Sequence, residues 1–372
     1  MNESPEKVQP ESIPGQAIYR ILVCRPNHRL GNMLLLTPLI IELERLYRGA
    51  EIDIVAEGNI ATEVFATFSS IKNIYCLPKR GFKHPISFLS MLFHIRRTRY
   101  DLIIDPSVGS NFGRTLTRFF NAKYKLGFDD PEKRSILTHR VPNSMAPRHM
   151  AIRPISLVRW HAGTEGRLAD LPPMDIRLTD AERERGRLLI CELLPASFRS
   201  NEKVVIGIFA NATGAKRYPR EWWNEFIAAL KKALPGCAIV EIIPMHGQSM
   251  LGSEWPGYYT SSIRRMGAVM SGVDLMISAD CGVMHLAVAS KVPTIGMFCV
   301  TDASVYAPYG PGNSPLLTQG QSATEAAQGV IEAYSGLLDP REQTSTASTQ
   351  GSTIPCTPND SARNPIQGTL RC

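Results

Sequence analysis

The stretch DLMISADCGVMHLAVASKVPTIGMFC (274–299) decides the fold of this chain of 372 residues. A short apolar run at 274–280 is followed by a helical stretch around 285–290 and a second apolar run at 293–299. Short apolar runs separated by a helix are typical of a βαβ unit, whose two strands lie parallel in one sheet. The stretch therefore predicts a parallel sheet covered by helices.

The same alternation fills most of the chain. Further strands are expected at 17–24, 51–57, 73–78, 101–105, 202–210 and 238–244. Helices are expected at 33–47, 85–100, 220–234, 261–270 and 322–338. This rhythm predicts an α/β fold with two Rossmann-like units whose parallel sheets face each other across a cleft.

Breaks in the rhythm set the domain boundaries. The segment 161–174 is rich in Gly and Pro, and we expect it to link an N-terminal domain (17–160) to a C-terminal domain (175–321). A C-terminal helix is expected at 322–339. The arm 1–16 and the tail 340–372 hold few large apolar residues, and we expect both to be disordered.

Composition narrows the class of protein. The net charge of +7 favours an anionic partner. No zinc-finger or RNA-binding motif is present, so nucleic acid is not the partner we expect. The eight cysteines form no CxxC pair, which indicates reduced thiols, no zinc site and a cytoplasmic protein. The first fifteen residues carry no apolar core, so we do not expect a secretory signal. No apolar run reaches ~18 residues without interruption, so we do not expect a transmembrane helix.

The first candidate site follows the strand at 274–280, because ligands of open parallel sheets bind at the carboxyl ends of the strands. Asp280 can accept hydrogen bonds from sugar hydroxyls, and His285 can donate one to a phosphate. Cys281 and Gly282 begin a helix, whose N-terminus suits a diphosphate. We expect Gly282 to let a phosphate approach the backbone. The alternative is an Asp cap followed by a core histidine.

Two further loops follow strands. The loop NATGAKRYP (211–219) places Lys216 and Arg217 before a helix, where cations suit only a bound anion. The loop RPNHRLGNML (25–34) contributes Arg25, His28 and Arg29 before another helix. It contains no GxGxxG fingerprint, and the chain has no Walker A sequence. The alternatives are solvated surface charges in the first loop and an ordinary turn in the second.

Weaker signals lie in the N-terminal half. Asp105 ends a strand and offers a carboxylate at the edge of the cleft, although a strand-end turn is the alternative. His149 precedes an apolar helix and is interpreted as structural. The cluster Arg96, Arg97 and Arg99 closes an apolar helix, where it suits either membrane phosphates or the helix C-terminus itself.

Taken together, the three loops resemble glycosyltransferase family 9, the bacterial heptosyltransferases of lipopolysaccharide core assembly. The resemblance is carried by RLGNMLLLTP (29–38), by Lys-Arg-Tyr-Pro (216–219) and by the signature Asp280-x-Gly282-x-x-His285 followed by Val292-Pro293. The order and spacing of these motifs fit over residues 18–338.

The resemblance implies a GT-B fold and an inverting, metal-independent transfer that uses no cofactor. It implies a nucleotide-sugar donor, ADP-heptose, and a glycolipid or oligosaccharide acceptor of the lipopolysaccharide core or a related surface glycan. The implied donor-binding residues are Thr213, Lys216, Tyr218, His246, Asp280, Cys281, Gly282 and His285. The implied acceptor-binding residues are Arg25, His28, Arg29 and Gly31. Because such acceptors are lipid-linked, peripheral contact with the inner face of the inner membrane is also expected.

Two departures from the family pattern concern the chemistry. Asn32 stands where the family commonly has the aspartate that acts as base, and an amide cannot take a proton from a hydroxyl at neutral pH. The candidate catalytic residues are therefore Asn32, Asp105 and Lys216. Either Asn32 orients the acceptor while a group such as Asp105 is the base, or activity is weak, or the chain binds sugar nucleotides without turnover. The loop after 238–244 carries His246 and Gln248 rather than a carboxylate for the ribose.

Overall fold

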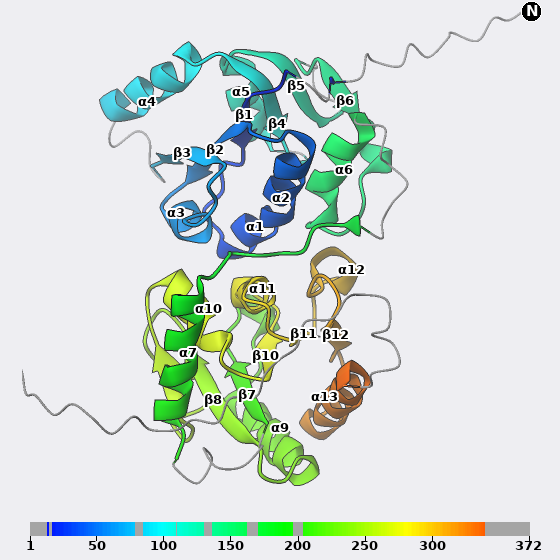
Figure 1. Cartoon of the computed structure of the whole chain (residues 1–372). Coiled ribbons are helices and arrows are strands. Elements are labelled where there is room, and N and C mark those ends of the chain that lie inside the picture. The colour runs from blue at the N-terminus through cyan, green and yellow to red at the C-terminus, as the bar shows by residue number, and fades with distance from the viewer. Residues whose placement is uncertain are drawn as a thin grey trace, which may run out of the picture.

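The chain folds into two α/β domains that are stacked on one another (Figure 1). The computed structural model describes residues 13–14, 17–78, 85–108, 110–129, 136–161, 170–195 and 204–338. Most of the expected arm, most of the expected linker and the whole tail 340–372 lie outside these ranges.

The N-terminal domain contains a six-stranded parallel sheet of order β3-β2-β1-β4-β5-β6. Its strands are β1 (Arg20–Cys24), β2 (Glu51–Glu57), β3 (Ile71–Leu77), β4 (Tyr100–Asp105), β5 (Ala122–Phe128) and β6 (His139–Val141). Its helices are α1 (Leu30–Leu34), α2 (Thr37–Leu46), α3 (Ile60–Val64), α4 (Pro85–Arg97), α5 (Asn111–Phe119) and α6 (Ile152–His161), with a 3₁₀ turn η2 (Asn143–Met145).

The C-terminal domain repeats the design with the order β12-β11-β10-β7-β8-β9, also parallel throughout. Its strands are β7 (Val205–Phe209), β8 (Ala238–Ile243), β9 (Gly257–Tyr259), β10 (Leu275–Ala279), β11 (Thr294–Phe298) and β12 (Asn313–Leu317). Its helices are α7 (Asp180–Leu193), α9 (Arg220–Ala233), α10 (Ile263–Met270), α11 (Gly282–Ala289), α12 (Ala303–Tyr306) and α13 (Ala323–Leu338), with a 3₁₀ turn η4 (Gly214–Lys216). The predicted fold of two Rossmann-like units is confirmed.

The helix expected at 33–47 is wrong in one respect, because the structure divides it into α1 and α2. Pro38 lies in the first turn of α2 and has no N–H to continue the ladder back to Leu34. The Thr37 hydroxyl donates to the Leu34 carbonyl instead, at 2.8 Å. A proline in a first helical turn starts a new helix at little cost.

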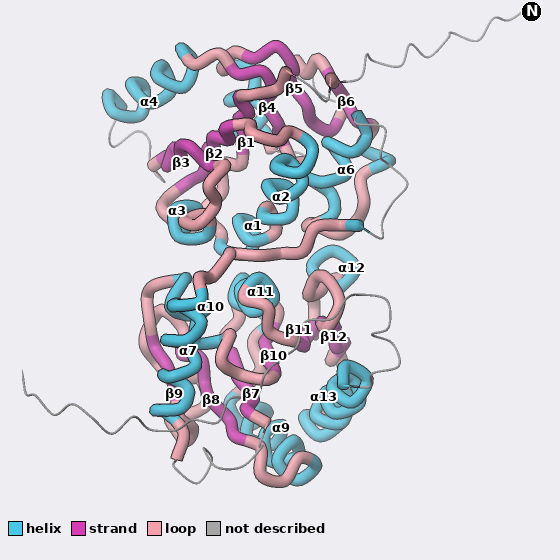
Figure 2. The backbone as a smooth tube through the Cα atoms, in the orientation of Figure 1, coloured by secondary structure: helices cyan, strands magenta, loops and turns pink. Residues whose placement is uncertain are grey.

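The two domains meet along an interface crossed by residues 170–179 (Figure 2). At one edge, the Glu63 carboxylate accepts hydrogen bonds from the Ser262 hydroxyl at 2.9 Å and the Ile263 N–H at 2.7 Å, so α3 caps α10. At the other edge, the Met150 N–H donates to the Val305 carbonyl at 3.0 Å. Between these edges α1 packs against α11. Each domain thus presents the N-terminus of one helix to its neighbour.

Within the described ranges, no helix has the length and apolarity needed to cross a bilayer.

Candidate active site

The loop between β10 and α11 places an acid and a helix N-terminus side by side. Asp280 is buried, and Cys281 rather than Asp280 holds the N-cap position of α11. A thiol is a weak hydrogen-bond acceptor compared with the usual Ser, Asp or Asn cap. Burial raises the pKa of the Cys281 thiol, which therefore stays uncharged. The positive end of α11 is thus left without an anionic cap of its own.

Lys216 reaches this loop from a different part of the chain. It ends η4, which follows β7, the strand beside β10 in the sheet. The Lys216 Nζ lies 2.8 Å from an Asp280 carboxylate oxygen, and the Lys216 side chain keeps 32% of its surface exposed. Two residues that the sequence assigned to the donor therefore meet at one sheet edge.

His285 lies one turn into α11 and is 3% exposed. Its Nδ1 has no hydrogen-bond partner among the described residues. Burial lowers the pKa of His285 to about 4, so the imidazole is neutral at neutral pH. A neutral imidazole presents one N–H donor and one acceptor, and it adds no positive charge to the site.

Gly282 lies at the interface between the two domains. A Cβ atom at Gly282 would lie 2.9 Å from the Gly31 nitrogen and 3.2 Å from the Leu30 Cβ. On the side where a Cβ would point, the backbone of α1 already fills the space. The glycine is thus explained by the close approach of α1 and α11.

The acceptor candidates of the N-terminal domain are arranged around β1 and α1. Arg25 donates to the Ser107 hydroxyl at 2.6 Å, and burial lowers its pKa. His28 lies 3.0 Å from the Glu57 carboxylate. Arg29 is exposed, and Asn32 is half-buried in α1.

Asp105 is fully buried in this domain. Its carboxylate lies 2.9 Å from the Arg114 Nε and accepts the Ser107 N–H at 3.1 Å. Burial raises the pKa of Asp105, and the Arg114 guanidinium opposes that rise. Through Ser107, the carboxylate positions the loop that holds Arg25. These contacts leave it 1% exposed, which favours a supporting role over proton transfer from an acceptor.

The remaining donor candidates differ in their surroundings. Thr213 is exposed at the start of η4. Tyr218 is buried, its hydroxyl pairs with Thr318, and its ring lies 4.4 Å from that of Trp222. Tyr218 is therefore built into an aromatic core. His246 is exposed and accepts the Gln248 N–H at 3.2 Å on its Nδ1.

Two further residues shape this region, and sequence reasoning missed the first of them. Glu241 is buried in β8 and accepts hydrogen bonds from the Ser249 hydroxyl and the Met250 N–H, so it holds the loop that carries His246. Its position as the one acid inside the apolar run 238–244 could have indicated a buried carboxylate with a specific role. His149 donates through Nε2 to the Ala307 carbonyl at 3.0 Å and so joins the two domains. Its interpretation as structural agrees with that contact.

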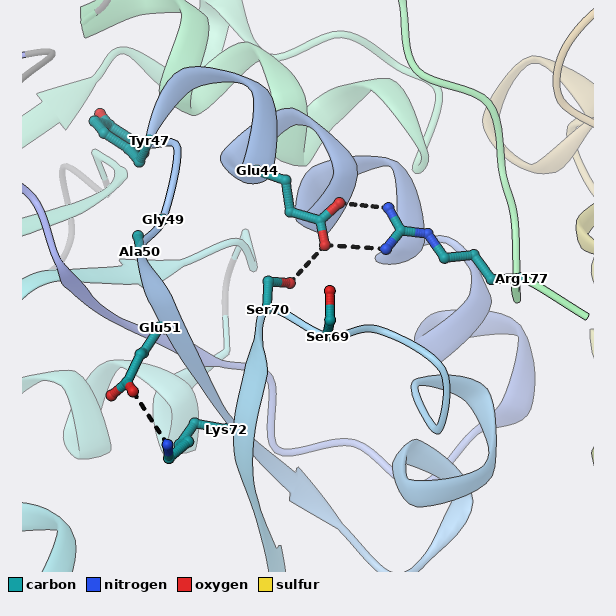
Figure 3. A pocket seen from close by; sticks show the side chains of 9 residues that line it. All are labelled: Glu44, Tyr47, Gly49, Ala50, Glu51, Ser69, Ser70, Lys72 and Arg177. Atoms are coloured by element: carbon teal, nitrogen blue, oxygen red, sulfur yellow. Dashed lines mark hydrogen bonds and ion pairs between the residues drawn. The ribbon is translucent and has the colours of Figure 1, made fainter. Parts of the chain in front are cut away.

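A surface pocket of about 440 Å³ lies elsewhere, at the amino ends of β2 and β3. There the Glu44 carboxylate is paired with Arg177 and accepts a hydrogen bond from Ser70 (Figure 3). The pocket therefore opens at the sheet edge opposite to the one where parallel sheets bind ligands.

Comparison with known proteins adds independent findings. The model of glycosyltransferase family 9 (heptosyltransferase) matches residues 260–333, which include Asp280, Gly282 and His285. A search of curated protein sequences finds no match. Among the described residues, no group of three or more His, Cys, Asp or Glu could hold a metal ion.

Solved structures share the whole architecture. A family 9 glycosyltransferase of Veillonella parvula is 18% identical, with a TM-score of 0.67 over 86% of this chain and 97% of its own. The Escherichia coli heptosyltransferase WaaC with ADP-2-deoxy-2-fluoro heptose is 18% identical, with a TM-score of 0.63 over 85% and 99%. The E. coli ADP-heptose heptosyltransferase II is 16% identical, with a TM-score of 0.63 over 86% and 98%.

These findings define the class of the fold as GT-B, the fold of these glycosyltransferases. Within that class the chain resembles family 9, the heptosyltransferases, and the family model confirms the resemblance over residues 260–333.

Proposed function

We propose that the protein is an inverting, metal-independent glycosyltransferase that moves heptose from ADP-heptose to a lipopolysaccharide-core or related surface-glycan acceptor. The observation that carries the proposal is the convergence of Lys216 and Asp280, 2.8 Å apart, at the N-terminus of α11. This arrangement suits a diphosphate, because a cation lies beside the positive end of a helix. Two E. coli neighbours were solved with ADP or an ADP-sugar, which supports ADP as the nucleotide.

The acceptor hydroxyl attacks the anomeric carbon on the face opposite to the diphosphate, the new C–O bond forms, and the bond to the diphosphate breaks. Charge grows on the leaving phosphate oxygens. Lys216 and the N-terminus of α11 stabilise that charge, and one preorganised donor of this kind lowers a barrier by ~3 kcal/mol. Binding requires Lys216 to exchange its contact with Asp280 for the phosphate, and Asp280 is then free to accept a sugar hydroxyl.

The acceptor lies against the N-terminal domain, near Arg25, His28, Arg29 and Gly31. Asn32 orients its hydroxyl through a hydrogen bond, and Asp105 fixes the Arg25 loop through Ser107. The hydroxyl proton passes to another group or to water, because the amide of Asn32 cannot take it. We expect the protein to work in the cytoplasm at the inner face of the inner membrane, where lipid-linked acceptors are present.

A second candidate function follows from the same amide. A chain with an intact donor site and no base would bind a sugar nucleotide without turnover and act as a scaffold or sensor. Multiple turnovers with an identified acceptor exclude this candidate, and donor binding without transfer to any core acceptor favours it.

The first test is a thermal-shift panel with ADP, ADP-heptose, UDP, GDP and CMP. A ligand at ~100 times its Kd adds ~2.7 kcal/mol to the folded state, which raises the Tm of a domain of this size by about 5–10 °C. Selective stabilisation by ADP or ADP-heptose is the expected result. Selective stabilisation by another nucleotide would indicate a different nucleotide-sugar donor. No shift with any ligand would contradict the proposed donor site.

A further inference from the structure

Helix α4 carries an apolar face that the rest of the described chain leaves largely exposed. Ile86, Leu89 and Phe93 are 84%, 50% and 53% exposed. Ile95 is the one buried residue that the helix contributes to the core. Figure 1 shows α4 projecting from the side of the N-terminal domain, away from the C-terminal domain. Folding alone therefore does not account for these three side chains, because a surface helix normally presents polar residues on the face away from the core.

The exposed side chains share one side of the helix. Positions 86, 89 and 93 follow the spacing i, i+3 and i+7, which lines one face. The opposite face contacts the sheet through Ile95, with Phe88, Met91 and Leu92 packed partly against the same core. The helix thus has two apolar faces. On the outer face the Phe93 ring contacts the Phe119 ring edge to face, with centroids 6.1 Å apart, and most of that face stays exposed.

Positive charge borders the exposed face. Arg97 continues the same row of positions one turn beyond Phe93, and its side chain is exposed. Exposed cations also surround the end of α4, where α5 ends and β5 begins: Arg97, Arg99, Arg118 and Lys123. Residues 85–100 include no Asp or Glu. Arg96 does not join this group, because its guanidinium lies 4.7 Å above the Phe119 ring.

We propose that the face of α4 formed by Ile86, Leu89, Phe93 and Arg97 docks the protein on an anionic phospholipid bilayer. Apolar side chains that line one side of a helix enter the boundary between headgroups and acyl chains, while arginines reach the phosphates. A second copy of the chain would also cover the apolar side chains, but it offers the same positive charge and no complement to it. An anionic bilayer provides both an apolar region for the side chains and phosphates for the arginines.

The docking proposal depends on the proposed function only for its purpose, which is to bring a soluble donor and a lipid-linked acceptor together. Lipid binding itself is measured without either substrate. A failure of the docking proposal therefore leaves the donor-binding test untouched, and a failure of the donor test leaves this one untouched.

The experiment is flotation of the full chain with two kinds of vesicle, pure phosphatidylcholine and phosphatidylcholine containing about 30% phosphatidylglycerol, at about 0.1 M salt. The wild type is expected to float with the anionic vesicles only. The double variant Ile86→Ser/Phe93→Ser is expected to lower the apparent partition coefficient about tenfold or more, since both side chains lose their apolar burial. Arg97→Glu is expected to lower it about fivefold or more.

The matched control is Leu188→Ser/Leu317→Ser, which removes two large apolar side chains that are 46% and 61% exposed on the C-terminal domain. It is expected to float like the wild type. Thermal unfolding of each variant verifies that it folds. The proposal is overturned if the wild type stays unbound on anionic vesicles, if both double variants lose binding equally, or if sedimentation shows a dimer that Ile86→Ser/Phe93→Ser dissociates.

Discussion

Gly282 of the C-terminal domain and Gly31 of the N-terminal domain lie so close that a Cβ on Gly282 would be 2.9 Å from the Gly31 nitrogen. The close approach brings the start of the proposed donor helix, α11, against the start of α1, which carries Asn32. Donor and acceptor candidates are therefore set next to each other by two residues that have no side chain.

The first prediction concerns this contact. Gly282→Ala is expected to lower the free energy of unfolding by about 1–3 kcal/mol, as overpacked interiors do, and to reduce sugar transfer. Gly31→Ala is the comparison, because its added Cβ would meet His285 Cδ2 at 3.3 Å and Gly282 Cα at 3.4 Å, a milder overlap. Chemical denaturation ranks the two variants. A larger loss for Gly31→Ala would contradict the explanation.

The second prediction isolates the role of Lys216. Lys216→Met is expected to lower kcat by about 10²–10³-fold, because the leaving diphosphate loses one preorganised cation. The free energy of unfolding should also fall, since the buried Asp280 carboxylate loses its ion-pair partner, so kcat is compared at a temperature where every variant is folded. Arg217→Met, the adjacent and exposed cation, is the control and should keep nearly the full rate. Equal rate losses in the two variants would remove the special role of Lys216.

The third prediction tests the amide at position 32. If Asn32 occupies the position of a base, Asn32→Asp supplies a carboxylate and raises the initial rate of ADP release with acceptor by tenfold or more, within the ~10²–10⁴-fold that general-base catalysis provides. Asn59→Asp, the same change at an exposed site in this domain, should leave the rate unchanged. A rate that is not raised by Asn32→Asp would place the base elsewhere.

The fourth prediction distinguishes support from catalysis at Asp105. Asp105→Asn leaves the largely buried Arg114 guanidinium without its charge partner, and breaking a buried pair typically costs about 3–5 kcal/mol of stability. Asp105→Asn/Arg114→Met should be less destabilised than the sum of the two single variants. Denaturant titration of the three variants gives the coupling. A stable Asp105→Asn protein with a strongly reduced kcat would instead indicate a catalytic carboxylate.

The fifth prediction concerns acid stability. Hydrogen bonds from Arg264 lower the pKa of Glu182 to about 2, below its ordinary value near 4.5. Since the folded pKa is the lower one, the ionised carboxylate stabilises the fold above pH ~4.5, and this contribution disappears as the pH falls toward 2. The carboxylate is partly exposed, so about 1–2 kcal/mol is expected.

Glu182→Gln should therefore flatten the loss of stability between pH 5 and pH 2, as measured by urea unfolding at each pH. Glu192→Gln makes the same change at an exposed position of α7 and should keep the slope of the wild type. An unchanged slope in Glu182→Gln would contradict the linkage.

The sequence predicts the central strands of both sheets well, because strands buried on both faces read as continuous apolar runs. The strands β5, β6, β9 and β12 were not predicted. Three of them lie toward a sheet edge and are short or partly polar, and β5 interrupts its apolar residues with Lys123 and Lys125. Their pairing depends on neighbours that are distant in the sequence.

The candidate site was predictable to the extent that topology alone determines it. Lys216 and Asp280 meet because β7 and β10 are neighbours and both end at the same edge. The surroundings of Gly282, His285 and Tyr218 were not predictable. Gly282 and His285 face the other domain, and Tyr218 faces an aromatic core. A local sequence motif does not show what its residues will pack against.

The packing of α1 against α11 has a consequence for the molecule as a whole. One buried apolar cluster contains Met33 and Leu34 of the N-terminal half together with Met266 and Leu286 of the C-terminal half. The two Rossmann-like units consequently share their hydrophobic interior, and pulling them apart would expose it to water. We therefore expect the two halves to unfold together, as a single thermodynamic unit.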